Sequence, residues 1–264
     1  MNHSILPAKC LAAMIAVPPL PGSPLYEGKS QLIIKSVLTD LAVYQSAGVK
    51  CVVLENSHDL PYIKPPLPQA AVDLMEKIAK EVRKRFKGWL GLQLLEAANE
   101  AALEIAAKAK FNFIRVESYV FAHIGGAGLI EGCAGTLLRK RKALKAESVK
   151  IFADIKKKHC SHALTGDLDI VDEAKQAEFF LVDGLIITGP RTGEAPDLKE
   201  LKRVRKAMKL PIWLGSGMTE QNIAAYFPLA DGFIVGSTFR EGENFLGKLE
   251  STRLKKFLKK FRSL

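Results

Sequence analysis

Eight short runs of apolar residues recur along the chain, and they constrain its fold more than any other feature of the sequence. Each run has the length of a buried strand, and stretches with helical periodicity, such as residues 70–85, 99–108 and 219–227, separate most of them. Continuous apolar strands that alternate with helices are typical of a parallel sheet that is buried on both faces. The eight predicted strands are residues 13–17, 51–54, 90–95, 113–116, 151–153, 185–187, 212–214 and 233–235.

The number of strand–helix units predicts a closed barrel. Eight units in 264 residues match a single (β/α)8 TIM barrel. The alternative, an open doubly wound sheet, would need an early Gly-x-Gly-x-x-Gly fingerprint, which the sequence does not contain. No linker or change in composition divides the chain, so we expect one domain over residues 1–264. Glycine precedes three of the strands, at Gly48, Gly184 and Gly232, and we expect it to adopt the left-handed conformation that ends a helix.

The connection after the fourth predicted strand is the longest in the chain. It runs over residues 117–149 and includes a glycine-rich stretch at 125–128 and a helical pattern at 136–144. A long insertion at the C-terminal face of a barrel is usually an active-site lid or an oligomer contact. The alternative is a packing flap that contacts no ligand.

Charge and cysteine content limit the classes of partner. The net charge is +11, and the excess lies in short blocks, most of them on predicted helices, which indicates solvated outer faces that also attract anionic ligands. No nucleic-acid-binding module is recognisable, so a nucleic acid is not an expected partner. The four cysteines form no Cys-x-x-Cys pair and no apolar run approaches the ~18 residues of a membrane span, which predicts a cytoplasmic protein. The basic blocks are residues 83–87, 139–145, 156–158, 199–209 and 255–262.

A basic helix is predicted at the C-terminus, over residues 249–263. Leu254, Phe257, Leu258 and Phe261 recur at helical spacing with lysines on the opposite side. The simplest interpretation is the eighth helix of the barrel, packed on the strands. The alternative is a basic amphipathic helix that makes a peripheral contact with an acidic membrane surface.

The last two predicted strands end in similar glycine-rich turns. In a TIM barrel, residues that directly follow the strands face the active site, and phosphate sites commonly form from the loops after strands seven and eight. Glycines let the backbone approach an anion, and the N–H groups of such turns donate to it. We expect Thr219 to cap the helix that follows the first of these turns. The alternative is a pair of tight turns that only close the barrel. The predicted phosphate-binding residues are Gly215, Ser216, Gly217, Gly236, Ser237 and Thr238.

Charged side chains follow the second and fifth predicted strands. Side chains alternate along a strand, so Asp154 and Lys156 are expected on the inner face, where an aspartate and a lysine can shift each other's pKa and handle a proton. This Asp-x-Lys element resembles that of phosphosugar decarboxylase barrels. The alternative for Asp154 is a structural ion pair with Arg115, which lies inside the fourth strand. The predicted acid–base residues are Glu55, Asp154 and His159, and Lys156 or Lys158 would stabilise negative charge on the substrate.

Other polar residues at the strand ends are candidates for substrate binding. Glu55 and Asp154 could alternatively hold a divalent metal, although no motif with established metal-binding spacing is present, and no other cofactor is expected. The predicted substrate-binding residues outside the glycine turns are Asn56, Arg115, Glu117, Thr188 and Gly189.

A series of motifs in one order resembles the BtpA/SgcQ family of predicted barrel enzymes, and the likeness covers nearly the whole chain. The matching motifs are Val-Pro-Pro-Leu-Pro-Gly-Ser-Pro at 17–24, Glu-Asn at 55–56 with Asp59 and Pro61, Phe-Ile-Arg-Val at 113–116, Gly-Cys-Ala-Gly at 132–135 with Arg139 and Arg141, Ala-Asp-Ile-Lys at 153–156 with Lys158 and His159, Thr-Gly at 188–189 and 192–193, Gly-Ser-Gly at 215–217 and Ala-Asp-Gly-Phe-Ile-Val-Gly at 230–236.

The resemblance implies a barrel of the ribulose-phosphate-binding type, with a phosphorylated sugar or nucleoside-type substrate. The cyanobacterial namesake of the family is linked to photosystem I biogenesis. The chain departs from the family pattern at residues 96–98, Glu-Ala-Ala in place of Arg-Asn-Asp, and at Glu117, where an asparagine is usual. We therefore expect an enzyme that binds a phosphorylated small molecule and uses acid–base chemistry. The alternative is a non-catalytic biogenesis or stability factor for a membrane complex. A homo-oligomer is expected only by analogy of fold.

Overall fold

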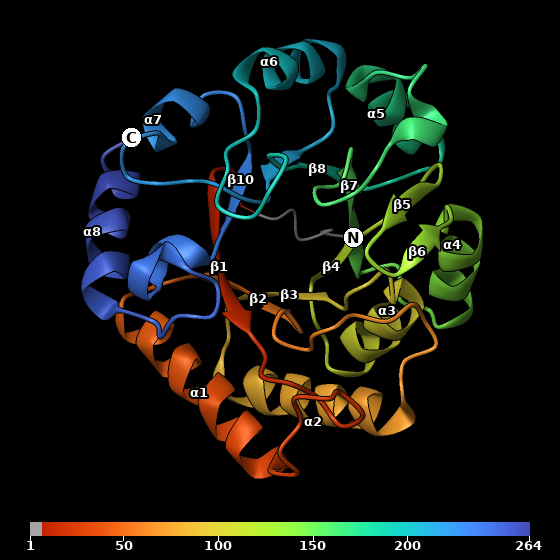
Figure 1. Ribbon diagram of the computed structural model, residues 1–264. Coiled ribbons are helices and arrows are strands. Elements are labelled where there is room, and N and C mark those ends of the chain that lie inside the picture. Colours follow the sequence, from red (N-terminus) through yellow and green to blue (C-terminus); the bar gives the residue numbers. More distant parts are fainter. Residues whose placement is uncertain (1–6) are drawn as a thin grey trace.

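The computed structural model describes residues 7–264, which form a closed barrel of eight parallel strands inside a ring of eight helices (Figure 1). The predicted TIM barrel is confirmed. Its strands pair in the closed order β1-β10-β9-β8-β7-β4-β3-β2. They are β1 Cys10–Ala16, β2 Cys51–Glu55, β3 Trp89–Gln93, β4 Phe113–Val116, β7 Lys150–Ile155, β8 Gly184–Ile187, β9 Ile212–Leu214 and β10 Gly232–Val235.

The helices lie where the periodicity predicts them, with one exception at the turn after β9. Thr219 makes the reciprocal bonds of a capping box there, because the Thr219 N–H donates to Asn222 Oδ1 at 2.8 Å and the Asn222 N–H donates to Thr219 Oγ1 at 3.3 Å, but regular helix does not follow at once. This turn delays the helix until Ile223 and leaves it four residues long. The helices are α1 Ser30–Ser46, α2 Gln69–Arg85, α3 Asn99–Lys108, α4 Ala134–Ala143, α5 Ile170–Phe179, α6 Leu198–Ala207, α7 Ile223–Tyr226 and α8 Ser251–Arg262.

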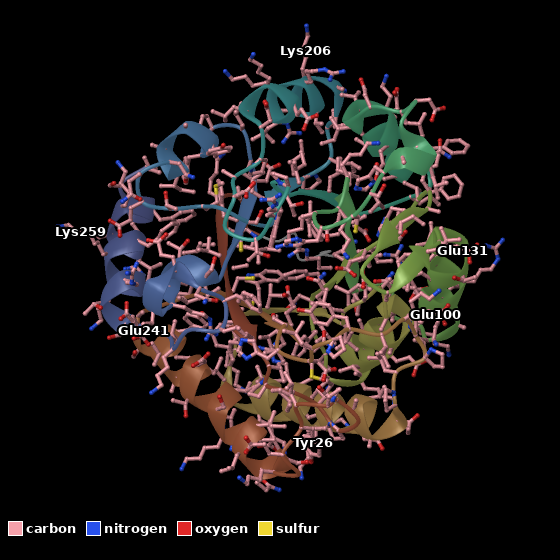
Figure 2. The ribbon with its side chains drawn as sticks, in the orientation of Figure 1. Tyr26, Glu100, Glu131, Lys206, Glu241 and Lys259 are labelled. Atoms are coloured by element: carbon pink, nitrogen blue, oxygen red, sulfur yellow. The ribbon has the colours of Figure 1, made fainter. Side chains whose placement is uncertain are left out.

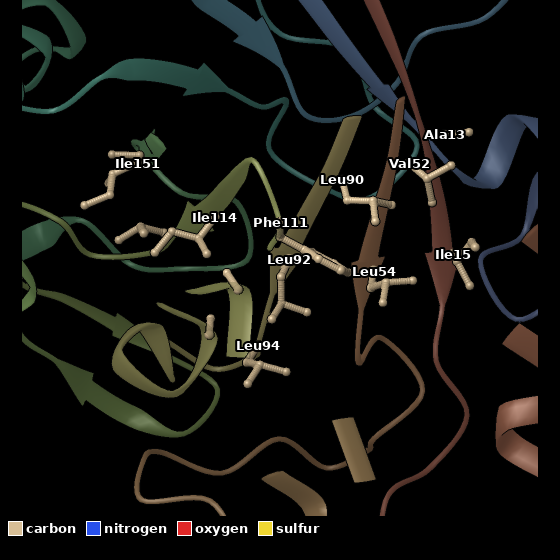
Figure 3. Packing of buried hydrophobic residues seen from close by; sticks show 14 of the residues in the cluster. Ala13, Ile15, Val52, Leu54, Leu90, Leu92, Leu94, Phe111, Ile114 and Ile151 are labelled. Carbon is tan, nitrogen blue, oxygen red and sulfur yellow. The ribbon is translucent and has the colours of Figure 1, made fainter. Parts of the chain in front are cut away.

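The main core lies between the strands and the surrounding helices. Alternate strand residues point outward into it, and Figure 3 shows Leu90 and Leu92 of β3 beside Val52 and Leu54 of β2. All four side chains are fully buried. Burial of this kind is worth roughly 1.5–3 kcal/mol for each aliphatic side chain, so this layer fixes which strand residues remain to face the barrel interior.

Aromatic rings fill the N-terminal floor of the barrel. A Cβ on Gly184 or Gly232 would clash with the ring of Phe152 or Trp213, so glycine is required there to make room. The expectation that these glycines take the left-handed conformation is therefore wrong, and of the three only Gly48 does, at φ +77°. The three rings, with centroids 4.9 to 5.7 Å apart, are Phe113, Phe152 and Trp213.

The long insertion after β4 contains an antiparallel hairpin, β5 His123–Gly125 and β6 Gly128–Ile130, followed by α4. The glycine-rich stretch is the turn of this hairpin. The Ile124 N–H donates to the Ser161 carbonyl at 3.0 Å and the Ser161 N–H donates back at 2.8 Å. These bonds tie the hairpin to the loop after β7, so the insertion forms a wall at the C-terminal end of the barrel.

The basic blocks on the helices lie on the outside, and Figure 2 shows Lys206 of α6 and Lys259 of α8 pointing away from the barrel; the block at 156–158 instead lies at the C-terminal mouth of the barrel. On α8 the apolar residues Leu254, Phe257 and Leu258 are buried against the barrel. The simpler interpretation of this helix therefore holds, and its apolar side is not free for a membrane. Within residues 7–264, no helix combines the length and the apolar character needed to cross a bilayer.

Candidate active site

A cavity of about 430 Å³ opens among the residues that end the barrel strands and begin the following loops. This volume lies within the range of small-molecule sites. The cavity has charged side chains from β2, β4 and the loop after β7, and glycine-rich backbone from the loops after β9 and β10. The predicted site residues that line it are Glu55, Arg115, Glu117, Lys158, His159, Gly215, Ser216, Gly217, Gly236, Ser237 and Thr238.

A buried ion pair lies beneath the cavity. Arg115 of β4 donates from Nε and Nη2 to both carboxylate oxygens of Asp154 on β7, at 3.0 to 3.2 Å, and its Nη1 lies 3.8 Å from Glu55 Oε2. Burial disfavours the charge, but Asp154 and Glu55 outweigh it and raise the pKa of the Arg115 guanidinium. The Asp154 side chain has no exposed surface and does not line the cavity. Asp154 therefore forms the structural ion pair with Arg115 that was the alternative to an acid–base role. This ion pair positions Arg115.

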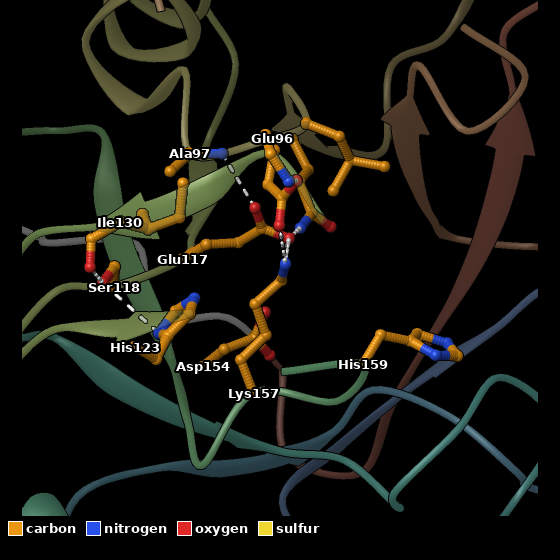
Figure 4. A network of polar contacts seen from close by, with 12 residues as sticks. Glu96, Ala97, Glu117, Ser118, His123, Ile130, Asp154, Lys157 and His159 are labelled. Atoms are coloured by element: carbon orange, nitrogen blue, oxygen red, sulfur yellow. Dashed lines mark hydrogen bonds and ion pairs between the residues drawn. The ribbon is translucent and has the colours of Figure 1, made fainter. Parts of the chain in front are cut away.

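Glu117 of the segment after β4 is a buried carboxyl group at the cavity wall. It accepts hydrogen bonds from Gln93 Nε2 at 2.9 Å and from the Ala97 N–H at 2.8 Å, and Lys157 Nζ lies 3.5 Å away. Burial outweighs Lys157 and raises the pKa of Glu117 to about 7. Lys157 also donates to Glu96 at 3.1 Å, and Figure 4 shows its ammonium between the two carboxyl groups. Near neutral pH, Glu117 can therefore both give and take a proton.

The loop after β7 reverses the expected inward and outward positions of the Lys156 and Lys157 side chains. Lys156 has a φ of +47°, so the alternation of β7 stops at Ile155. Lys156 Nζ donates to the Thr165 carbonyl at 3.3 Å and lies 3.9 Å from Glu173, whereas Lys157 and Lys158 line the cavity. The structure therefore does not bring Lys156 to the site, and the likeness to an Asp-x-Lys element does not hold in space.

His159 lies at the rim of the cavity. Its Nε2 accepts a hydrogen bond from the Thr192 N–H at 3.1 Å and lies 3.0 Å from Thr192 Oγ1. Burial and the neighbouring Lys158 lower the pKa of His159. Figure 4 shows its ring directed away from Glu117 and Lys157. The imidazole thus ties the loop after β7 to the loop after β8, and its nitrogen is already engaged there.

The glycine-rich loops after β9 and β10 present backbone N–H groups at the cavity. Within residues 7–264, the N–H groups of residues 216–218 and 236–238 meet no hydrogen-bond acceptor. Gly217 has a φ of +70° and a Cβ there would lie 2.2 Å from the backbone of Glu194, so this position requires glycine, whereas a Cβ on Gly236 would only displace the end of the Met14 side chain, 2.6 Å away. Unpaired N–H groups on two adjacent loops form the kind of concave donor surface that binds anions.

The remaining predicted residues support the walls. Ser216 Oγ accepts from the Gly189 N–H at 3.1 Å and donates to the Glu194 carbonyl at 3.0 Å, so its hydroxyl holds the loop after β8. Asn56 is fully buried and bonds both the N–H and the carbonyl of Leu95. Asn56, Thr188 and Gly189 do not line the cavity, so a direct contact with substrate is not supported for them.

The carboxyl groups are placed for ion pairs. Asp154 and Glu55 both face Arg115, which takes up the space between them. In the part of the chain that the structure describes, no three His, Cys, Asp or Glu side chains are arranged to hold a metal ion. A metal at Glu55 and Asp154 stays a prediction.

The sequence does not predict three of the polar residues that line the cavity, Gln93, Glu96 and Lys157. Gln93 ends β3 with its side chain inward, and its Oε1 is buried with no partner among residues 7–264. A polar residue at the last position of an apolar strand is the same signal that identified Glu55, so Gln93 could have been found. Glu96 and Lys157 depend on loop conformation, and no local pattern places them.

Three comparisons with known proteins complete the description of the site. The sequence model of the BtpA family matches residues 7–263. An uncharacterized mitochondrial protein of Caenorhabditis elegans is 42% identical over 95% of this chain and 92% of its own length. The photosystem I biogenesis protein BtpA of Synechocystis is 30% identical over 91% of this chain and 83% of its own length.

Among solved structures, phosphoribosyl anthranilate isomerase from Thermus thermophilus superposes with a TM-score of 0.58. It covers 96% of this chain and 98% of its own, at 12% sequence identity. At that identity the likeness establishes the barrel fold alone, and it agrees with the closed strand order described above.

Proposed function

This chain belongs to the BtpA family, and from that premise we propose that it is an enzyme that binds a phosphorylated small molecule and acts on it by acid–base chemistry. The observation that carries the proposal is the set of N–H groups on residues 216–218 and 236–238, which border the cavity and have no acceptor within residues 7–264. A phosphate offers several acceptor oxygens to such a surface. The ligand class is a phosphorylated sugar or nucleoside-type compound.

The position of these loops supports the phosphate. They follow the seventh and eighth strands of the barrel, β9 and β10, where TIM-barrel enzymes commonly bind phosphate. The name of the structural neighbour phosphoribosyl anthranilate isomerase also contains a phosphorylated compound. Gln93 Oε1, which has no partner among the described residues, would accept a hydrogen bond from a hydroxyl group of the ligand.

The chemistry is assigned to the charged half of the cavity. Glu117, with a pKa of about 7, donates a proton to the substrate in its acid form and accepts one in its carboxylate form. Glu55 supplies the second carboxyl group, and Arg115 stabilises negative charge that develops on the substrate. Asp154 keeps Arg115 in place and does not reach the substrate itself.

Isothermal calorimetry with inorganic phosphate, ribose 5-phosphate and ribose tests the proposal. We expect binding of both phosphate compounds and weaker or no binding of ribose. Ser237→Asp should weaken phosphate binding by about tenfold or more, because it adds a like charge beside the anion. The matched variant Ser237→Asn has a similar size and no charge, and should bind nearly as wild type does. Equal affinity of the Asp and Asn variants would contradict the assigned phosphate position.

A second candidate function is a non-catalytic biogenesis factor for a membrane complex, which the name of the Synechocystis relative favours. The buried apolar side of α8 leaves a polar side with four lysines and two arginines to contact a lipid surface. Co-sedimentation with phosphatidylserine vesicles distinguishes the two. A membrane-associated factor should sediment with the vesicles at ~0.15 M salt. A protein that contacts the vesicles only through its surface charge should stay in the supernatant, because salt screens that attraction.

A further inference from the structure

Three cationic side chains reach the cavity wall, and two of them are held by carboxylates. Arg115 is bound by Asp154, and Lys157 lies 3.1 Å from Glu96 and 3.5 Å from Glu117. Lys158 forms no hydrogen bond and no ion pair within residues 7–264. It is therefore the one of the three whose amine is available to a ligand.

The backbone explains why Lys158 is separated from the carboxylates. The left-handed conformation of Lys156 turns the chain at the end of β7, and His159 also has a positive φ, +58°. Two reversals in four residues direct Lys157 toward Glu96 and leave Lys158 at the cavity beside Arg115. The engaged ring of His159 fixes the far side of this turn on Thr192.

The surroundings of Lys158 destabilise its charged form. Burial and the positive charge of Arg115 lower the pKa of Lys158, and the carboxyl groups of Glu55 and Asp154 offset only part of this effect. Desolvation next to another cation is one of the ways in which proteins make a lysine nucleophilic. The neutral amine carries the lone pair that attacks a carbonyl carbon.

We infer that Lys158 is a nucleophilic amine that forms an imine with an aldehyde or ketone group of a phosphorylated ligand held in the same cavity. The phosphate part of this inference rests on the proposed function. It assigns to Lys158 a covalent role in place of simple charge stabilisation. It also narrows the ligand class to phosphorylated carbonyl compounds, such as the open-chain form of a sugar phosphate.

The proposed step balances without an oxidant or a reductant. The Lys158 nitrogen attacks the carbonyl carbon, a C–N bond forms, and the carbonyl oxygen becomes a hydroxyl group after transfer of a proton from the nitrogen. A second proton, supplied by the acid form of Glu117, lets that hydroxyl leave as water while the C=N bond forms. The remaining N–H proton returns to Glu117, so amine and carbonyl are converted to imine and water.

Reductive trapping of the full chain tests this step. The probe is glycolaldehyde phosphate at limiting concentration with sodium cyanoborohydride, and the readouts are intact mass and peptide mapping. We expect one adduct, on Lys158, formed about tenfold faster than on any other lysine, because binding of the phosphate raises the concentration of the aldehyde beside Lys158 and the lowered pKa of Lys158 enlarges the neutral fraction of its amine. Lys158→Arg should lose this adduct. Lys156→Arg, which changes a lysine outside the cavity, should keep it.

Two further arms separate the failure of this inference from failure of the proposed function. If calorimetry detects phosphate binding but the adducts spread evenly over surface lysines, the imine is overturned and the phosphate site stands. If unphosphorylated glycolaldehyde labels Lys158 as fast as its phosphate does, the nucleophilic amine stands and its phosphorylated ligand is overturned. Retained phosphate binding in Lys158→Arg, with loss of the adduct, supports both.

Discussion

The two halves of the barrel mouth are built differently. The half formed by the loops after β9 and β10 has no charged side chain at residues 215–218 or 235–238 and presents backbone N–H groups. The half formed by β2, β4 and the loop after β7 contains Glu55, Arg115, Glu117 and the two cavity lysines. Backbone conformation shapes the first of these, the glycine half. In the second, the charged half, buried charges hold one another in place.

This difference shows where each half is vulnerable. A buried charge is tolerated only with its partner, so removing one member of a pair in the charged half leaves the other uncompensated. In the glycine half the donors are on the backbone, so no side-chain deletion removes them. Mutations in the charged half should therefore have the larger effects on stability. Mutations in the glycine half should have the larger effects on anion affinity.

The largest expected effect is the loss of Arg115. Arg115→Met leaves Asp154 buried without a partner, which should lower the free energy of unfolding by about 3–5 kcal/mol. Urea denaturation at pH 7 measures it. The double variant Arg115→Met with Asp154→Leu should recover most of the loss. If the single variant were as stable as wild type, the view that the charged half depends on compensation would be wrong.

The next effect depends on pH and isolates Glu117. Because its folded pKa, about 7, lies above the ordinary value of 4.5, the folded state binds more protons than the unfolded state between these pH values. The stability from this group is present below pH 4.5 and is lost as the pH rises through 7, by about 3 kcal/mol in total.

Glu117→Gln should remove this loss, so the difference in unfolding free energy between variant and wild type should change by that amount from pH 4.5 to pH 8. Thermal and urea unfolding at four or five pH values measure the difference. Glu100→Gln changes an exposed carboxyl group on α3 and is the matched control. Parallel pH profiles for wild type and Glu117→Gln would contradict the raised pKa.

The smallest effects compare two serines of the glycine half. Ser216→Ala leaves the Gly189 N–H and the Glu194 carbonyl without their partner and should cost about 1–3 kcal/mol. Ser237→Ala removes a hydroxyl that has no hydrogen-bond partner within residues 7–264, and should change stability by less than about 0.5 kcal/mol. Equal losses in the two variants would mean that Ser216 does not brace the loop after β8.

Much of this architecture could be predicted before the structure. The strands 113–116 and 212–214 and the helix 99–108 match β4, β9 and α3, because their apolar patterns depend only on nearest neighbours in the chain. The sequence also predicts that the glycine turns lie at the mouth, because residues that follow barrel strands meet at one face. The sequence also predicts the pairing of Arg115 with Asp154 as an alternative, since a buried arginine requires an acceptor.

Errors arose where side-chain direction depends on a single backbone angle. The positive φ of Lys156 exchanges the positions of Lys156 and Lys157, and no neighbouring residue in the sequence signals it. The sequence predicts helix-ending turns at Gly184 and Gly232, whereas their role is to make room for aromatic rings from neighbouring strands. The glycine error concerns contacts between segments that lie far apart in the chain. The lysine error concerns a backbone torsion that such contacts select.

The sequence by itself determined the barrel, the order of its units and the face on which function lies, because periodicity and chain length are local properties that eight repeats reinforce. Only the tertiary structure decided which charges meet. Whether a carboxyl group holds its proton to about pH 7, as Glu117 does, and whether a lysine is paired, as Lys157 is, depend on burial and on distances of a few ångströms between separate strands and loops. Coulomb energies vary steeply over such distances, and residue order does not encode them.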